Sequence, residues 1–178
     1  MPSYVIFLRA VNVGGRFVKM ADLRAALESA GFTDVETHIQ SGNVFVRSGR
    51  RSTGAVGTEM AAVLGELTGF DVPCVVRTPV QLRTALAEID AVPPMLTGAK
   101  RYVAFADAPV PAAAAAQLDA WDGPGERCLV LGSQILAEMT DGFQKTKLTN
   151  TRIERITGRT TTWRDLKVVR AIDEKWGA

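Results

Sequence analysis

The sequence has very few of the side chains that build metal sites or disulfide frameworks. Its 178 residues include two cysteines, Cys74 and Cys128, and a single histidine, His38. Two cysteines and one histidine, far apart in the sequence, do not form a zinc-binding motif, so a zinc enzyme is excluded. We expect no metal and no cofactor. Both cysteines lie in apolar, strand-like stretches, which predicts buried free thiols in a reducing cytosol.

Long apolar runs are also missing. The run from Val5 to Leu8 stops at Arg9 and is too short for a signal peptide. No segment has the roughly 18 apolar residues of a membrane helix, so we expect a cytoplasmic protein without a membrane partner. The formal net charge of +2 is too small to indicate a nucleic-acid partner by itself, so any basic surface has to be local.

The composition that remains, 47% hydrophobic and 22% charged residues, is that of an ordinary globular protein. Apolar periodicity in the first half predicts strands and helices in the order β-α-β-β-α-β. The expected strands are 4–10, 34–39, 43–48 and 72–77, and the expected helices are 21–30 and 55–68. Thr78, Pro79 and Gln81 then predict a capped helix that ends near Asp90.

The second half repeats this order. The stretch "YVIFLRAVNV" (4–13) is echoed by "YVAFADAPV" (102–110). The elements expected after it are a helix at 111–120, a hairpin about Gly132-Ser133, a helix near 151–157 and a strand at 159–162. Thr162 to Asp165 resembles the cap at Thr78 and predicts the start of a terminal helix.

We therefore predict an α+β fold of two duplicated ferredoxin-like βαββαβ units, each with an extra C-terminal helix. The expected units are residues 1–92 and 100–178, and a linker at 93–99 that contains Pro93-Pro94 joins them. A single mixed α+β domain without duplication is the alternative.

Polar residues gather in "LRAVNVGGRFVKM" (8–20) and in "QSGN" (40–43). In a ferredoxin-like sheet the third strand lies antiparallel beside the first, so both stretches share one edge. There they form a candidate site for an anionic small molecule or nucleic acid, because a Gly-Gly pair near a helix N-terminus favours anions. The candidate ligand-binding residues are Arg9, Asn12, Gly14, Gly15, Arg16, Lys19, Gln40, Ser41 and Asn43.

A simpler interpretation of this edge is a Gly-Gly turn with solvated cations. The equivalent stretch in the second half, "AFADAPVPA", has neither Gly-Gly nor a basic residue, which favours a site in the first half alone. A secondary candidate is "QKTKLTN" (144–150), where Lys145, Lys147, Thr149 and Asn150 precede a short helix. Thr151 and Glu154 predict a capping box there, which explains the polar residues equally well.

Three functions remain open besides simple anion binding. Basic loops are compatible with a nucleic-acid-binding module, although the apolar strands indicate a sheet buried on both faces. Arg16 with Asn43 or Gln40 resembles acylphosphatase-like hydrolases at the level of the fold only. A protein-interaction module without a ligand is the third.

No nucleophile is paired with a base in this sequence. Ser41 has no obvious partner, and His38 is expected on the solvent-facing side of its strand. Asp22 is better explained as a first-turn helix charge than as a catalytic acid. The sequence therefore assigns no catalytic residue.

The segment "FLRAVNVGGRFVKMADLRAALESAGFTDVETHIQSGNVFV" (7–46) closely resembles the start of the bacterial domain of unknown function 1697 family. Its members typically carry LR-x-x-N-V-G-G, then K-M-x-x-L, then Y-I-Q-S-G-N-V. Residues 145–154 and Thr162-Trp163 also resemble the second half of the family, although the Arg-Asn pair that often precedes the Trp is absent, and His38 replaces a usual Tyr. The resemblance implies a small cytoplasmic protein with no assigned reaction and supplies no catalytic residues.

Overall fold

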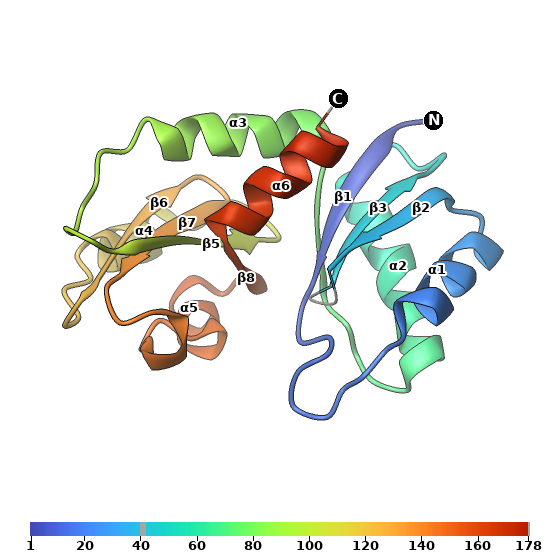
Figure 1. Cartoon of the computed structure of the whole chain (residues 1–178), viewed down its shortest axis with the longest axis horizontal. Helices are drawn as coiled ribbons and strands as arrows, with labels where there is room; N and C mark the ends of the chain where they lie inside the picture. The colour runs from blue at the N-terminus through green and yellow to red at the C-terminus, as the bar shows by residue number, and fades with distance from the viewer. Residues whose placement is uncertain (40–41, 178) are drawn as a thin grey trace. The chain divides into compact units, whose positions relative to one another are not determined.

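The computed structural model describes residues 1–39 and 42–177, and its first half contains one four-stranded sheet. The elements of this half are β1 (Ser3–Leu8), α1 (Met20–Ser29), β2 (Thr33–His38), β3 (Asn43–Arg47), α2 (Thr53–Thr68), β4 (Cys74–Arg77) and α3 (Pro79–Asp90). The strand order is β2-β3-β1-β4, and all neighbours are antiparallel (Figure 1). The predicted order of elements is confirmed, with ends shifted by one or two residues.

The second half contains a sheet of the same design. Its elements are β5 (Lys100–Ala106), α4 (Ala112–Asp119), β6 (Glu126–Leu131), β7 (Gln134–Met139), the 3₁₀ helix η1 (Phe143–Lys145), α5 (Asn150–Thr157), β8 (Thr161–Asp165) and α6 (Leu166–Trp176). The strand order is β6-β7-β5-β8, again with antiparallel neighbours. The described residues therefore form a mixed α+β structure with two four-stranded antiparallel sheets and six α-helices.

The end of the second half differs from the prediction. Thr162 does not cap a terminal helix, because β8 continues through Asp165 and pairs with β5, with Thr162 opposite Phe105. Helix α6 begins at Leu166 instead, and the Asp165 carboxylate accepts a hydrogen bond from the Lys167 amide at 2.8 Å. A Thr-rich run that ends in Trp fits a buried strand better than a helix cap, because β-branched and aromatic side chains pack well on a pleated sheet.

Contacts divide the chain into one unit of Met1–Leu82 with Ile172–Ala178, and a second unit of Arg83–Ala171. This division differs from the expected ranges 1–92 and 100–178. The later turns of α3 belong to the second unit, and the end of α6 belongs to the first. Helix α3, which follows the last strand of the first sheet, thus ends in the second unit, and α6, which follows the last strand of the second sheet, ends in the first unit.

In the second unit, a buried ion pair fixes the chain that follows α3. Arg101 Nε lies 2.9 Å from Glu138 Oε1, and the Glu138 side chain is almost fully buried. The same guanidinium donates to the backbone carbonyls of Ile89 and Val92, at 3.2 and 2.8 Å. The second carboxylate oxygen of Glu138 accepts from the amides at 95 and 96, so the expected linker is held by side-chain hydrogen bonds.

The main core of the first unit lies between its sheet and two helices. Helices α1 and α2 cover the same face of the sheet (Figure 1). Alternate residues of β1 point into this core, and so do Leu23 and Leu27 of α1 and Met60 of α2. Every residue from Tyr4 to Leu8 is buried, as expected for a sheet covered on both faces.

The end of α6 covers part of the other face of this sheet. The Trp176 ring stacks on Phe45 with centroids 5.7 Å apart and meets the edge of His38 at 6.1 Å. The Trp176 indole N–H donates to Glu36 at 3.0 Å, and Lys175 Nζ lies 2.9 Å from the same carboxylate. The face of β2 that was expected to face solvent, with His38 on it, is therefore partly covered by the end of α6.

Hydrogen bonds from Lys175 and Trp176 lower the pKa of the Glu36 carboxyl below its ordinary value of 4.5. A carboxyl whose pKa is lower in the folded state stabilises the fold above pH 4.5, and that contribution is lost as the pH falls through the folded-state pKa. We expect Glu36→Gln to reduce the free energy of unfolding at pH 7, by about 0.2–1 kcal/mol because the pair is half-exposed. The difference from wild type should shrink at pH 3, as measured by urea unfolding.

Lys175→Gln provides the matching variant from the other side of the pair, and its loss at pH 7 should be similar. A Glu36→Gln effect of equal size at both pH values would show that the carboxylate charge does not contribute.

Candidate functional site

The loop after β1 and the β2–β3 hairpin meet at one edge of the first sheet, as the strand order predicted. The Leu8 amide donates to the Gly42 carbonyl at 2.8 Å, and Phe7 pairs with Asn43. The next amide, that of Arg9, donates to the Pro73 carbonyl just before β4 at 2.9 Å. Three segments that are distant in sequence are thus joined here by backbone hydrogen bonds.

The tip of the loop is a tight turn that accounts for the Gly-Gly pair. The Arg16 amide donates to the Val13 carbonyl at 3.1 Å across Gly14 and Gly15, whose φ angles are +59° and +84°. Two successive positive φ angles are the mark of a type I′ turn, which favours glycine. The Asn12 side chain then accepts from the Val18 amide at 2.8 Å and closes the base of the loop. The glycines are therefore explained by the turn without a ligand.

Backbone strain is concentrated at the same edge. Four non-glycine residues have positive φ angles within residues 1–39 and 42–177, and three of them, Ala10, Asn12 and Ile39, lie in the loop or at the start of the hairpin. For a β-branched residue such as Ile39 this conformation is rare. Strained residues of this kind cost on the order of 1–3 kcal/mol each and gather at functional sites.

The predicted site residues do not all face the same way. The Asn43 side chain is fully buried and donates to the His38 carbonyl at 3.1 Å, so it holds the hairpin. The Arg16 guanidinium lies over the Phe70 ring, 5.1 Å from its centroid. Lys19 is exposed at the start of α1, where it gives no capping hydrogen bond. Gln40 and Ser41 lie outside the described residues.

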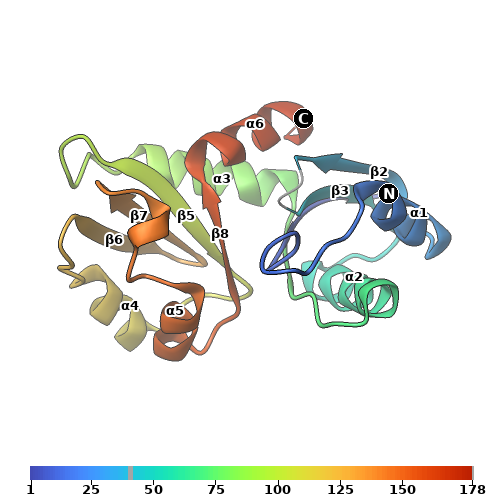
Figure 2. The same ribbon diagram turned by 60° about the horizontal axis from the view of Figure 1, so that its bottom comes forward.

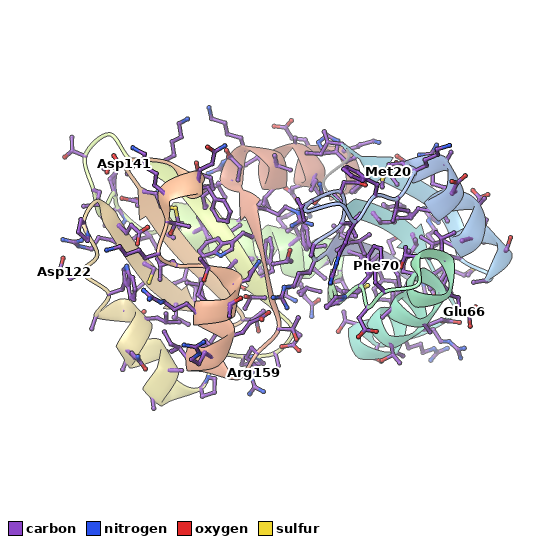
Figure 3. The ribbon with its side chains drawn as sticks, turned by 90° about the horizontal axis from the view of Figure 1, so that it is seen from below. Met20, Glu66, Phe70, Asp122, Asp141 and Arg159 are labelled. Carbon is purple, nitrogen blue, oxygen red and sulfur yellow. The ribbon has the colours of Figure 1, made fainter. Side chains whose placement is uncertain are left out.

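A surface depression of about 570 Å³ opens beside the loop, and we call it the loop depression. Its lining comes from the loop, the first turn of α1 and the end of α2. The lining residues are Asn12, Phe17, Val18, Lys19, Met20, Asp22, Leu67 and Thr68. Figure 3 labels Met20, at the start of α1, and Phe70, just beyond the end of α2.

The loop depression combines apolar and charged surface. Phe17 is 77% exposed, an unusual position for a large aromatic ring. Val13 and Leu67 are further exposed apolar residues of this region. The side chains of Lys19 and Asp22 have no hydrogen bond or ion pair anywhere in the part of the chain that the structure describes. Such a surface offers stacking area and both signs of charge to a ligand.

Sequence reasoning identified Asn12 and Lys19 but missed the rest of this lining. Leu67 and Thr68 carry no local signal, because only the packing of α2 brings them to the loop. Phe17 did carry one, since an aromatic residue between Arg16 and Lys19 in a polar loop has no core to fill.

The secondary cluster is a structural network rather than a second depression. Thr149 is the N-cap of α5 and accepts from the Arg152 amide at 3.3 Å, so the capping box predicted at Thr151 is wrong. The Asn150 side chain accepts from the Thr161 hydroxyl at 3.0 Å and ties α5 to β8. Both lysines are exposed: Lys145 faces Asp141 at 3.9 Å, and Lys147 uses its backbone amide to bond Glu126.

Reactive groups are few in the described residues. Burial raises the pKa of both thiols, Cys74 and Cys128, to about 12, so neither is a thiolate at neutral pH. No cluster of three or more His, Cys, Asp and Glu side chains suited to a metal ion was found in residues 1–39 and 42–177. Across the same residues, every helix is too short or too polar to cross a membrane.

The second unit has an equivalent sheet edge, but a short connection replaces the long loop after β1. There the Ala106 amide donates to the Ser133 carbonyl at 2.8 Å, and the Asp107 amide donates to the Thr160 carbonyl at 3.0 Å. Asp107 therefore occupies the position of Arg9. Residues 107–111 suffice to reach α4, whereas residues 9–19 are used to reach α1. Figure 2 shows the longer connection as a curl that extends away from its sheet.

Comparison with known proteins identifies the family of this chain. A family model described as "Protein of unknown function (DUF1697)" matches residues 1–135, which include the loop and the hairpin. The chain belongs to the DUF1697 family. The matched range of this DUF1697 protein ends before the secondary cluster.

A solved structure, that of the conserved bacterial protein SP0830 from Streptococcus pneumoniae, is similar to this DUF1697 protein. It has a TM-score of 0.71 and 19% sequence identity, and the match covers 100% of this chain and 99% of that one. At this identity the likeness supports the fold alone. No curated protein matches the chain at a significant level.

The hairpin of this DUF1697 protein requires glycine at position 42. A Cβ added to Gly42 would lie 2.9 Å from Leu8 Cβ, and the φ angle is +78°. Gly14 has a similar φ angle of +59° but nothing within 4 Å, so it serves as the matched control. We expect Gly14→Ala to cost about 1–2 kcal/mol of unfolding free energy through φ alone. Gly42→Ala should cost a further 1–3 kcal/mol, roughly, through overpacking.

Urea unfolding of the two variants measures this difference directly. Equal losses would mean that the hairpin shifts away from β1 without cost, and that the edge is not rigid.

Proposed function

We propose that this DUF1697 protein binds a phosphate-bearing ligand at the loop depression of its first unit. The observation that carries the proposal is an exposed lysine, Lys19, on the wall of the depression, whose side chain has no hydrogen bond or ion pair in the described residues. A cation without a partner beside a concave surface is suited to an anionic group, because a charge-assisted hydrogen bond is about twice as strong as a neutral one.

Arg16 supplies a second cation close to the depression. Its guanidinium stacks on Phe70, two residues after Thr68, which lines the depression. Stacking uses the face of the guanidinium plane and leaves the N–H groups at its edge for acceptors. A guanidinium held on a ring is also already ordered, so less side-chain entropy is lost when it binds an anion.

The scaffold fits this proposal. We propose that both units are ferredoxin-like and arose by duplication in a bacterial, cytoplasmic protein whose two thiols remain reduced. Three likenesses support duplication: the strand orders, the backbone bonds at the two edges, and the sheet registers, in which Arg77 lies opposite Val5 and Arg164 opposite Val103. The second unit connects its first strand to its first helix with only residues 107–111, so the fold does not require the longer, basic and strained loop of the first unit.

Two alternatives have different support. An acylphosphatase-like hydrolase would use Arg16 with Asn43 or Gln40. Asn43 is fully buried and Arg16 is stacked on Phe70, while Gln40 lies outside the described residues. A protein-interaction module is favoured by the exposure of Phe17 and Val13, because contiguous exposed apolar surface marks contact sites. The phosphate proposal accounts for Lys19 and Arg16 as well.

Thermal unfolding with ribose 5-phosphate and the four common nucleoside monophosphates tests the proposal. We expect at least one of these probes to raise the Tm of wild type by about 5–11 °C at 100 times its Kd, because binding to the native state adds about 2.7 kcal/mol. Lys19→Ala and Arg16→Ala should reduce that rise. Lys147→Ala, which removes an exposed lysine of the secondary cluster, should leave it unchanged.

Identical Tm shifts in Lys19→Ala and Lys147→Ala would place anion binding elsewhere in the protein. No shift with any probe would leave the protein-interaction module as the better function.

A further inference from the structure

The loop depression carries a negative charge as well as a positive one. Asp22 is exposed on its wall, and no hydrogen bond or ion pair engages its side chain in residues 1–39 and 42–177. A carboxylate accepts hydrogen bonds and repels anions, so a bare phosphate engages only Lys19 of these two charges. A ligand that engages both side chains carries an anionic group for Lys19 and hydrogen-bond donors for Asp22.

The apolar part of the depression limits the shape of that ligand. Phe17 is 77% exposed, and Val18, Met20 and Leu67 extend the apolar wall. An exposed aromatic ring next to cations is the arrangement on which nucleic-acid bases stack. The volume of about 570 Å³ lies within the range of small-molecule sites, roughly 300–1,000 Å³. A flat heterocycle joined to a phosphate meets these conditions.

The carboxylate selects among the bases. Guanine presents two adjacent donors on its pairing edge, a ring N–H and an exocyclic amine, and these match the two oxygens of one carboxylate. Adenine and cytosine present one donor group beside an acceptor, and uracil presents one donor between two acceptors, so each of them would face Asp22 with at least one repulsive contact.

We infer that the loop depression is a guanine-nucleotide site, in which Phe17 stacks on the base, Asp22 accepts hydrogen bonds from its pairing edge and Lys19 contacts the phosphate. This inference rests on the proposed function and names its ligand. Asp22 also lies in the first turn of α1, where a negative charge is favourable in any protein. The experiment therefore has to separate recognition of a base from support of the helix.

Isothermal titration with GMP and IMP makes that separation, because IMP lacks only the exocyclic amine. We expect wild type to bind GMP between about 5-fold and about 150-fold more tightly than IMP, the range that a bidentate pair gives. Asp22→Asn should lower the affinity for GMP to about that for IMP. Glu28→Gln, which neutralises another exposed carboxylate of α1, should keep the preference.

Phe17→Ala tests the stacking contact. Its affinity for GMP should fall between about 5-fold and about 150-fold, and the affinity for ribose 5-phosphate should not change, because that ligand has no base. A short uridine strand that carries one central guanosine distinguishes the two sources of the base. Tighter binding of the strand than of GMP assigns the site to single-stranded RNA, and equal or weaker binding assigns it to the free nucleotide.

Equal affinities of wild type for GMP, IMP, AMP and UMP would overturn the inference, and so would an Asp22→Asn variant that keeps the preference for GMP. If Lys19→Ala still abolishes binding in those cases, the phosphate site stands and only its ligand is wrong. If no nucleotide and no ribose 5-phosphate binds, both proposals fail.

Discussion

The hydrogen bond from the Leu8 amide to the Gly42 carbonyl is the constraint on which the candidate site depends. It extends the β1–β3 ladder past the last strand pair and fixes the point at which the chain leaves the sheet. Because Gly42 has a positive φ angle and its Cα lies against Leu8, the hairpin can approach β1 this closely only with glycine. The loop therefore starts from a rigid base, and its strained residues are held by their surroundings.

The order of elements was predictable because strands that are buried on both faces and helices with one apolar face leave clear periods in the sequence. The capping box at Thr78 and Gln81 is local chemistry, and it forms as predicted, with bonds of 2.9 and 3.1 Å. The same local reasoning failed at Thr162, where pairing with β5 decides the conformation. Pairing across some 60 residues of chain outweighs a propensity for caps, and no local pattern reports it.

Only those features of the candidate site that follow from the strand order could be predicted from the sequence. Topology was sufficient to bring the loop and the hairpin to one edge. It did not show that Asn43 is buried in the hairpin, because an Asn at the start of a strand looks the same whether its amide faces solvent or a backbone carbonyl. Nor did it show the wall supplied by Leu67, which depends on the length and packing of α2.

The exchange of helix ends between the two units has a consequence for the chain as a whole. A cut near residues 93–99 would separate the chain into two fragments. The first would keep the later turns of α3, which belong to the second unit, and the second would keep the end of α6, which belongs to the first unit. The first fragment would lack Trp176, so Phe45 would lose the ring that stacks on it. The second fragment would lack the Ile89 carbonyl of α3, which accepts a hydrogen bond from Arg101. The two halves are thus complementary fragments, whose stability is shared rather than summed.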